Sequence, residues 1–282
     1  MVALVTGQHG FIGAHAVRAL EAAGISVRGA GRPELEIPSP AFDAVLRDLA
    51  PDLVVHCAGP ASVQAAELDP EADRHGSVDV LAALIERLRP DTRLLLVSSA
   101  AVYGDPRTLP IGTNAEIAPI SAYGRHRAAC EELALDAGAP CSLARVFSAY
   151  GEGLERQVWW DIGRRAARRE PVTLFGTGRE SRDFIHGADV GRALATLATR
   201  AAYEGEAYNV ASGAETTIAE LAERIVHTFG DDTPIEFTGA ARAGDPQRWR
   251  ADVSAIAALG FECHVTLDEG VDRYVAWLRT LA

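Results

Sequence analysis

Residues 2–13 read VALVTGQHGFIG, and this stretch decides the fold. The mostly apolar start predicts a short buried strand, and glycines follow at positions 7, 10 and 13. A helical pattern then runs to Gly24, which caps its end. Glycine allows a positive φ and a close backbone approach to a diphosphate, and the start of a helix offers free N–H groups. The stretch therefore predicts a dinucleotide-binding strand–turn–helix.

Apolar runs and helical patterns alternate through the rest of the first half. We expect strands at 25–31, 52–59, 93–104 and 141–151, and helices at 41–52, 78–90 and 122–138. Strands that alternate with helices and are apolar on both faces predict an α/β fold with a doubly wound parallel sheet of the Rossmann type. Ligands of such sheets bind at the carboxyl ends of the strands.

The alternation loosens after residue 155. Residues 182–200 are expected to be helical and 206–213 to form a strand. Helices at 216–229 and 267–282 and a strand at 234–239 predict a smaller C-terminal α/β lobe. We expect a dinucleotide-binding domain at 1–154, to which about 183–212 returns, and a substrate-binding lobe at 155–182 and 213–282.

Composition excludes several classes of function. The chain has 282 residues and a formal charge of −12, which argues against a nucleic-acid partner. Its four cysteines and eight histidines show no metal-ligand spacing, so no metal is expected. The first residues do not resemble a signal peptide, and no apolar run could span a membrane, so we expect a cytoplasmic protein. All 27 residues counted as Lys or Arg are arginine.

The end of the second strand bears on the choice of cofactor. It reads Gly29-Ala30-Gly31-Arg32, without the carboxylate that binds the 2′-hydroxyl of NAD. An arginine suits a 2′-phosphate, so Arg32 favours NADP(H) over NAD(H), although NAD(H) stays possible. The alternative is that Arg32 faces solvent.

The motifs taken together resemble the extended short-chain dehydrogenase/reductases, the NAD-dependent epimerase/dehydratase family that acts on nucleotide sugars. The resemblance covers nearly the whole chain and rests on these segments: TGQHGFIG, HCAG, SSAAVYG, AYGRHR, ARVFSAYGEG, RDFIHGADV, YNVASG and RAGD. It implies a nucleotide-sugar substrate and leaves a homodimer possible.

The resemblance also implies roles for particular residues. Ser99 would hydrogen-bond the reacting oxygen, Tyr123 would be the acid/base, and Arg127 would contact the nicotinamide ribose. Ser148 would face the sugar, and Arg182 would hold the nucleotide together with Arg242 and Asp245. The cofactor would lie against Tyr123, Arg127, Arg32 and these residues: Gly7, Gly10, Phe11, Ile12, Gly13, Ala58 and Gly59.

Three departures from the family pattern stand out. Arg127 occupies the position of a lysine; it can lower the pKa of Tyr123 but cannot relay a proton. Ser148 replaces an asparagine of the sugar pocket, and Ser77 replaces one near the cofactor. We therefore expect catalysis that is impaired or re-routed rather than absent.

The position between Ser99 and the Val-Tyr pair bears on the reaction. The family's dehydratases and carboxylate-forming members carry acidic residues there, whereas this chain has Ala100 and Ala101, so dehydration is set aside. Residues 31–59 are similar to the compact dTDP-4-keto-6-deoxyhexose reductases. The hypothesis is an NADP(H)-dependent 4-ketoreductase of a nucleotide sugar. The alternatives are an NAD-dependent 4-epimerase and, because of Arg127, a cofactor-binding or non-redox protein.

Overall fold

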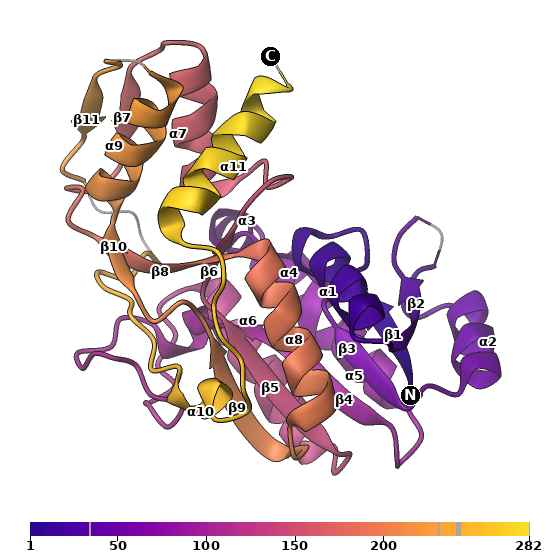
Figure 1. The fold of residues 1–282 in the computed structure, drawn as a ribbon. Coiled ribbons are helices and arrows are strands. Elements are labelled where there is room, and N and C mark those ends of the chain that lie inside the picture. The colour runs from indigo at the N-terminus through magenta and orange to yellow at the C-terminus, as the bar shows by residue number, and fades with distance from the viewer. Residues whose placement is uncertain (34, 231, 241–243, 282) are drawn as a thin grey trace.

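A six-stranded parallel sheet forms the centre of the molecule in the computed structural model, which describes residues 1–33, 35–230, 232–240 and 244–281 (Figure 1). Its strands in spatial order are β2 (Ser26–Ala30), β1 (Val2–Thr6), β3 (Leu53–His56), β4 (Arg93–Ser99), β5 (Cys141–Val146) and β9 (Glu204–Val210). The chain runs outward from β1 in both directions, so the switch point lies between β1 and β3. The predicted doubly wound fold is confirmed.

Helices cover both faces of this sheet. α1 (Phe11–Ala22) and α8 (Gly187–Arg200) pack on one face, and α2 (Pro40–Leu49), α5 (Val80–Ile85) and α6 (Ala122–Asp136) pack on the other. Successive side chains of a strand point to opposite faces. Accordingly, Ala3 and Val5 belong to the core beneath α1 and α8, whereas Leu4 belongs to the core beneath α2, α5 and α6.

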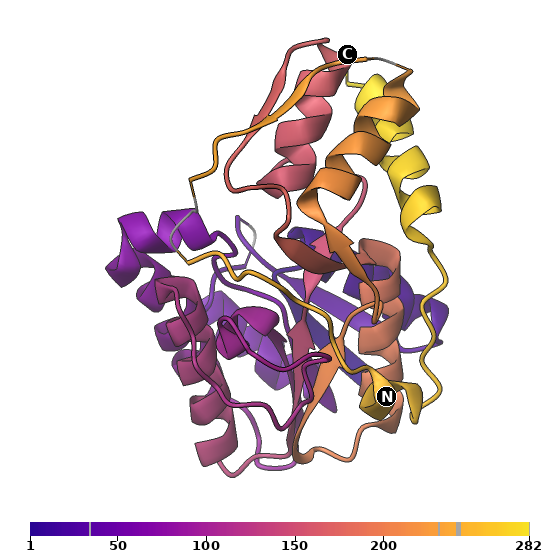
Figure 2. The same cartoon turned by 90° about the vertical axis from the view of Figure 1, so that its left-hand side faces the viewer.

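A second group of elements, which we call the cap, lies beyond the carboxyl ends of the strands (Figures 1 and 2). It contains α7 (Gln157–Ala167), α9 (Ile218–Phe229) and α11 (Leu267–Arg279), with a two-stranded sheet of β7 (Val172–Leu174) and β11 (Ile235–Phe237). A core of its own, built around Trp159 and Tyr274, holds these elements together. The predicted division of the chain into two units stays a prediction.

A three-stranded sheet lies between the large sheet and the cap. It contains β10 (Glu215–Thr217), β8 (Ser181–His186) and β6 (Ser148–Tyr150). The remaining elements are α3 (Val63–Leu68), α4 (Pro70–Arg74), a π-helical turn His75–Asp79, a 3₁₀ turn Ala100–Tyr103 and α10 (Ser254–Ala257). Among the residues that the structure describes, no helix is long and apolar enough to cross a membrane.

Several predicted elements differ from the structure. The strand expected at 93–104 ends at Ser99, where a 3₁₀ turn begins, and the helix expected at 78–90 is α-helical only over Val80–Ile85. The single strand expected at 141–151 is split, because the Phe147 N–H still donates to Val210 O in the large sheet while Ser148 pairs with Phe184 in the small one. The helix expected from residue 182 begins only at Gly187, because Ser181–His186 pairs with strands on both sides. The His186 side chain then accepts the Ala188 N–H and caps α8.

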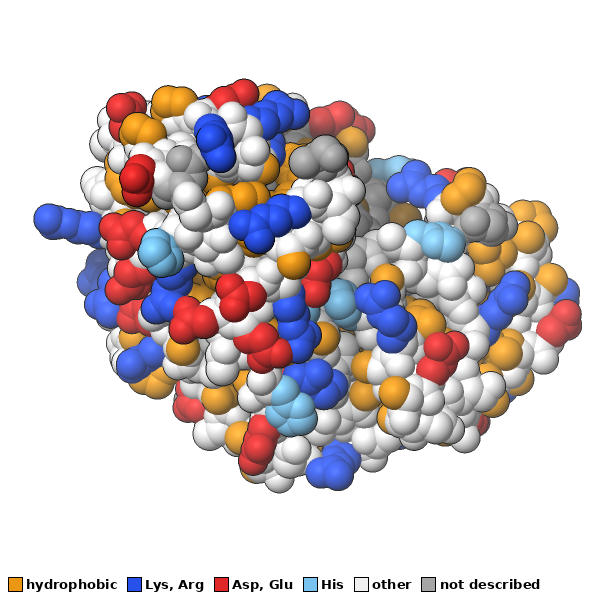
Figure 3. Space-filling model, turned by 45° about the horizontal axis from the view of Figure 1, so that its top comes forward, with side chains coloured by type: hydrophobic (Ala, Val, Ile, Leu, Met, Phe, Trp, Pro, Cys, Tyr) orange, Lys and Arg blue, Asp and Glu red, His pale blue; other side chains and the backbone are white. Residues whose placement is uncertain are grey.

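Acidic and basic side chains are interspersed over the face that carries the cap (Figure 3). The most basic stretch of the chain, residues 164–170, includes the end of α7. Arg164 pairs there with Asp161 at 3.6 Å, and Arg165 donates to the backbone oxygen of Pro171 at 3.2 Å. These contacts fit a solvated helix end rather than a surface for a polyanion.

Trp159 provides a test of the cap core. It is 1% exposed, stacks on Tyr150 with ring centroids 3.9 Å apart and meets Tyr274 edge-on. We expect Trp159→Ala to lower the free energy of unfolding by about 3–5 kcal/mol because it leaves a large cavity. Denaturant unfolding measures this, with the half-buried neighbour Trp160→Ala as the control. Equal losses in the two variants would contradict the placement of Trp159 at the centre of the core.

Candidate functional site

The loop after β1 packs closely against the loop after β3. Gly7 has a φ of +69°, and its N–H donates to Ala30 O at 2.7 Å. A Cβ on Gly7 would lie 2.8 Å from the backbone of Ala58, and one on Gly13 would run into the Gly7 carbonyl oxygen. The first turn of α1 reads FIGA and so presents its N–H groups without a nearby carboxylate on that turn. This cradle suits a diphosphate.

A cavity of about 300 Å³ opens directly above this cradle. Residues 10–13 form one wall, Cys57, Gly59 and Ala61 form a second, and residues 153–156 close it from the side of the cap. The structure therefore brings Gly10, Phe11, Ile12, Gly13 and Gly59 together around one space, with Gly7 and Ala58 packed against each other. Sequence reasoning missed the segment 153–156, apart from Gly153 in the quoted motif.

Arg127 ties α6 to the loop after β3. Its side chain is buried, and Nη2 donates to the backbone oxygen of Pro60 at 2.7 Å. A Cβ on Gly59, whose φ is +130°, would lie 2.8 Å from that nitrogen. The guanidinium carbon lies 5.2 Å from the centroid of the Tyr123 ring. Arg127 thus sets its positive charge beside the tyrosine and next to the cavity wall.

One side-chain nitrogen of Arg127, Nε, is buried and has no hydrogen-bond acceptor within the described ranges. A buried donor without a partner is costly, so a bound group that accepts from it would be favoured. The glycine cradle and this free donor both fit a nicotinamide dinucleotide, which would carry its diphosphate at the cradle and a ribose near Arg127.

Ser99 and Tyr123 come from different elements that meet at this edge of the sheet. Ser99 ends β4, and its Oγ accepts the Ala101 N–H at 3.2 Å. Tyr123 lies in the first turn of α6, which docks so closely that a Cβ on Gly124 would be 2.5 Å from the Ala101 oxygen. Tyr123 accordingly packs against the cluster that contains Ala101.

A buried polar network underneath fixes these segments relative to one another. Glu131 of α6 accepts from Ser98 Oγ at 2.5 Å and from Arg145 Nη2 at 2.7 Å. Arg145 also donates through Nη1 to the Tyr103 hydroxyl at 2.9 Å, and Tyr103 donates to Asn209 Oδ1 at 2.7 Å. A buried ion pair is stable only when its remaining donors and acceptors are satisfied, as they are for this pair. Sequence reasoning did not find this network.

The predicted substrate residues are only partly brought together. Arg182 Nη1 donates to Pro246 O at 2.8 Å, and its guanidinium lies 5.7 Å from the Trp249 ring. Burial lowers the pKa of Arg182, and the charge of nearby Asp245 opposes that shift. Ser148 is half-buried on β6. Arg242 lies outside the described residues.

The similarity to known proteins matches this geometry. The family model described as "NAD dependent epimerase/dehydratase family" matches residues 3–211. The chain belongs to this family. A UDP-glucose 4-epimerase from Azospirillum brasilense is 30% identical to the chain over 99% of it and 92% of the relative. UDP-glucuronic acid decarboxylase 1 from Arabidopsis thaliana is 29% identical over 98% of the chain and 69% of the relative.

A solved structure is similar to the whole chain. MoeE5 in complex with UDP-glucose and NAD is 28% identical, covers all of both chains and superposes with a TM-score of 0.90. The predicted family is thereby confirmed, and so is the prediction of an enzyme. The similarity favours the 4-epimerase alternative over the 4-ketoreductase hypothesis, and it supports a nicotinamide dinucleotide without an NADP(H) preference. The roles predicted for single residues stay predictions.

Arg32 lies apart from the cavity of this family member. It is exposed, two residues beyond the end of β2. The Gln8 side chain occupies the space that a Cβ on Gly29 would need, and Gln8 Nε2 lies 3.2 Å from His9 Nε2. The end of β2 is thus lined by polar side chains of the glycine loop, and Arg32 is not among the residues that line the cavity.

Ser77 has a local role in this family member. Ser77 lies in the π-helical turn, and its buried hydroxyl donates to the backbone oxygen of Asp73 in the preceding helix α4 at 2.6 Å. The hydroxyl is therefore occupied by a local contact, and the structure does not bring Ser77 into the lining of the cavity.

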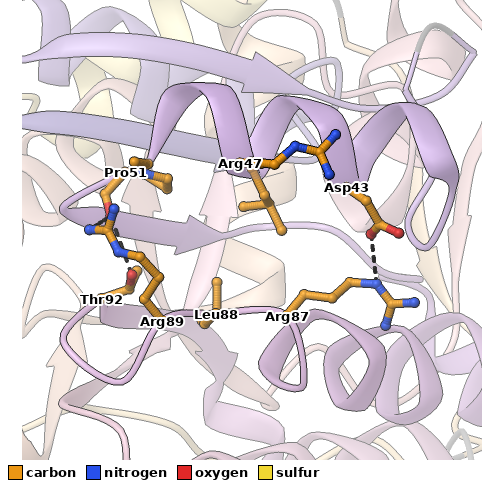
Figure 4. Close-up of a pocket in the computed structure, with 9 residues that line it drawn as sticks. Asp43, Arg47, Pro51, Arg87, Leu88, Arg89 and Thr92 are labelled. Carbon is orange, nitrogen blue, oxygen red and sulfur yellow. Dashed lines mark hydrogen bonds and ion pairs between the residues drawn. The ribbon is translucent and has the colours of Figure 1, made fainter.

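A second cavity, of about 310 Å³, lies at the opposite edge of the sheet (Figure 4). It opens between α2 and the turn before β4, where Pro51 and Thr92 precede β3 and β4. Arg87 Nε donates to Asp43 across its mouth at 2.8 Å. None of the predicted site residues lines it, and ligands of a doubly wound sheet bind at the other edge. The carboxyl edge is therefore the candidate active site.

His56 at the end of β3 makes the site sensitive to acid. Burial, and secondarily the charge of Arg127, lowers the pKa of His56 to about 3. Its Nδ1 lies 2.8 Å from Thr6 Oγ1, which also accepts the Ala58 N–H at 3.3 Å. The Thr6 hydroxyl hydrogen is therefore free to be donated to a neutral His56.

We expect stability to fall as the pH drops from about 6.5 towards 3. The unfolded chain protonates His56 in this window while the folded chain does not, so His56 contributes a slope of up to about 1.4 kcal/mol per pH unit. His56→Asn should flatten the pH dependence of the unfolding free energy. The control is His75→Asn, whose side chain is 79% exposed. Identical slopes in wild type and His56→Asn would refute this assignment.

Proposed function

We propose that the chain is a nucleotide-sugar 4-epimerase that works with a bound nicotinamide dinucleotide. The observation that carries the proposal is the position of Arg127, whose guanidinium lies beside the Tyr123 ring and against Gly59 of the cavity wall. Ser99 ends β4 at the same edge of the sheet. The near full-length similarity to a 4-epimerase supports it. The reaction would oxidise the sugar at C4 and reduce the ketone from its other face.

Each group has a distinct task in this proposal. The Tyr123 phenolate oxygen takes the proton of the 4-hydroxyl and, as the phenol, later returns it to the ketone oxygen. The Ser99 hydroxyl hydrogen-bonds the same oxygen and orients it. Arg127 places a positive charge beside Tyr123, since its guanidinium lies 5.2 Å from the ring centroid. When bound, the dinucleotide supplies the hydride chemistry.

The substrate's nucleotide would lie on the side of the cap. We assign its diphosphate to Arg182, whose planar guanidinium suits two phosphate oxygens, and its ribose to Asp245. Arg242 is proposed for the same nucleotide on the basis of the sequence motif alone. Ser148 would face the sugar.

Two buried alanines argue against elimination. Ala100 and Ala101, which are 0% and 8% exposed, follow Ser99 at the position where the dehydratases and carboxylate-forming members carry acidic residues. Neither alanine can donate or accept a proton. The chain therefore lacks the extra acid and base at this position that elimination across two carbons requires.

A 4-ketoreductase is the second candidate. The observation that favours it is the end of β2, where residues 26–33 carry no carboxylate and Arg32 is exposed. Such an edge suits the 2′-phosphate of NADP(H). A reductase would bind this cofactor reversibly, whereas an epimerase uses the same molecule twice and retains it.

The wider organisation is proposed as follows. Residues 1–154 and about 183–212 bind the dinucleotide, and residues 155–182 and 213–282 bind the substrate. The protein works in the cytoplasm, and a homodimer fits what is usual for the family. Size-exclusion chromatography with light scattering tests the dimer.

The first experiment identifies the nucleotide that co-purifies and then supplies each C4 epimer of a UDP-hexose. We expect retained NAD and interconversion of the two epimers without added cofactor. Reversible NADPH binding, with reduction of a nucleotide 4-ketosugar and no epimerisation, would replace the proposal by the 4-ketoreductase. A protein that binds neither dinucleotide would be a non-redox member of the family.

Arg127 has its own test. We expect Arg127→Lys to stay within about tenfold of the wild-type turnover because the cation remains beside Tyr123. Arg127→Met should lose roughly 100-fold or more in kcat because it removes both the positive charge beside Tyr123 and the hydrogen bond to Pro60. Circular dichroism checks that both variants fold. Full activity in Arg127→Met would show that the charge is not used.

A further inference from the structure

The segment that closes the cavity from above is firmly anchored in the cap. Leu154 is 3% exposed and belongs to the cap core. Its backbone oxygen accepts the Tyr274 hydroxyl at 3.0 Å. On its N-terminal side, Glu152 pairs with the buried His186 at 2.8 Å. Glu155 and Arg156 therefore extend from a fixed base rather than from a free loop.

The backbone holds Arg156 at the cavity instead of inside a helix. Arg156 is extended, with a φ of −159°, and forms the N-cap of α7. The next residue, Gln157, has a φ of +65°, a left-handed conformation that is uncommon for residues other than glycine. Gly153 is also left-handed, with a φ of +89°. These turns keep Arg156 facing the space that α1 faces from the other side.

Charge identifies the kind of group that would fill this space. Arg156 is the one cation, and Glu155 the one carboxylate, among the described residues that line the cavity. The opposite wall is the start of α1, which carries a partial positive charge and free N–H groups. A diphosphate seated there is held on one side only, unless a donor reaches it from the cap.

We propose that Arg156 binds the diphosphate of the dinucleotide from the cap side, opposite the glycine cradle. A guanidinium can hold two phosphate oxygens at once, and both residues at the tip are exposed, so Glu155 has room to turn towards solvent. One cofactor would thereby connect the large sheet to the cap. The inference rests on the proposed function only for the class of cofactor, not for the sugar reaction.

Calorimetry on protein stripped of nucleotide tests the assignment, with NAD, NADP and UDP titrated separately. We expect Arg156→Gln to lower the affinity for the dinucleotide that the wild type binds by about 10- to 100-fold, because a charged contact is lost. The affinity for UDP should stay unchanged. Arg156→Lys should recover part of the loss. Arg168→Gln, at the exposed far end of α7, should bind like the wild type. The salt dependence of dinucleotide binding should also be weaker in Arg156→Gln.

Other outcomes would overturn the inference. Unchanged dinucleotide affinity in Arg156→Gln would do so, and so would a loss confined to UDP, which would assign Arg156 to the substrate's diphosphate. Equal losses of dinucleotide affinity in Arg156→Gln and Arg168→Gln would mean that the effect comes from the general surface charge rather than from a contact of Arg156. A wild-type protein that binds NAD but epimerises no nucleotide sugar would refute the proposed function and leave the role of Arg156 standing.

Discussion

The contact between the loops after β1 and β3 is the constraint on which the site depends. Gly7 and Gly13 leave no room for a Cβ on either residue, because the backbones of Ala58 and Gly7 already occupy that space. This approach fixes α1 over the switch point of the sheet and points its N–H groups into the cavity. Gly59 likewise has no room for a Cβ, since one would lie 2.8 Å from Arg127 Nη2. The lack of a side chain at these three glycines therefore determines how closely the two loops pack and how closely α6 approaches the cavity.

A second constraint acts from beneath. The acid/base and the hydroxyl of the proposed mechanism stand on α6 and β4. Glu131 of α6 accepts a hydrogen bond from Ser98 of β4 and forms a buried ion pair with Arg145 of β5, so it joins these elements inside the core. Removing either partner would leave a buried charge uncompensated, which commonly costs several kcal/mol. The network thus makes the relative position of Ser99 and Tyr123 a property of the folded core rather than of surface loops. Rigid support of this kind is what positioning in catalysis requires.

The sequence predicts the parallel sheet and the glycine cradle because both follow from local patterns, namely apolar periodicity and glycine spacing. It does not predict that the strand at 141–151 changes sheets, since Phe147 and Ser148 sit in one apolar run and only their distant partners Val210 and Phe184 separate them. Arg156 was missed for the same reason. It lies far along the chain from Gly10, and only the anchoring of Leu154 in the cap brings the two together.

Under the proposed function, Arg127 would preserve the site while changing its chemistry. A lysine would present one point charge on a flexible stem. The guanidinium has several donors: Nη2 donates to Pro60 O, and Nε is buried without an acceptor among the described residues. The arginine can therefore hold the loop after β3 and keep a cation beside Tyr123 at the same time. An arginine cannot pass on a proton, so its part in the proposed mechanism is to keep a positive charge beside the phenol. Under the proposed mechanism this suffices for an epimerase, because the proton that Tyr123 takes in the oxidation returns to the sugar in the reduction and no net exchange with solvent is needed.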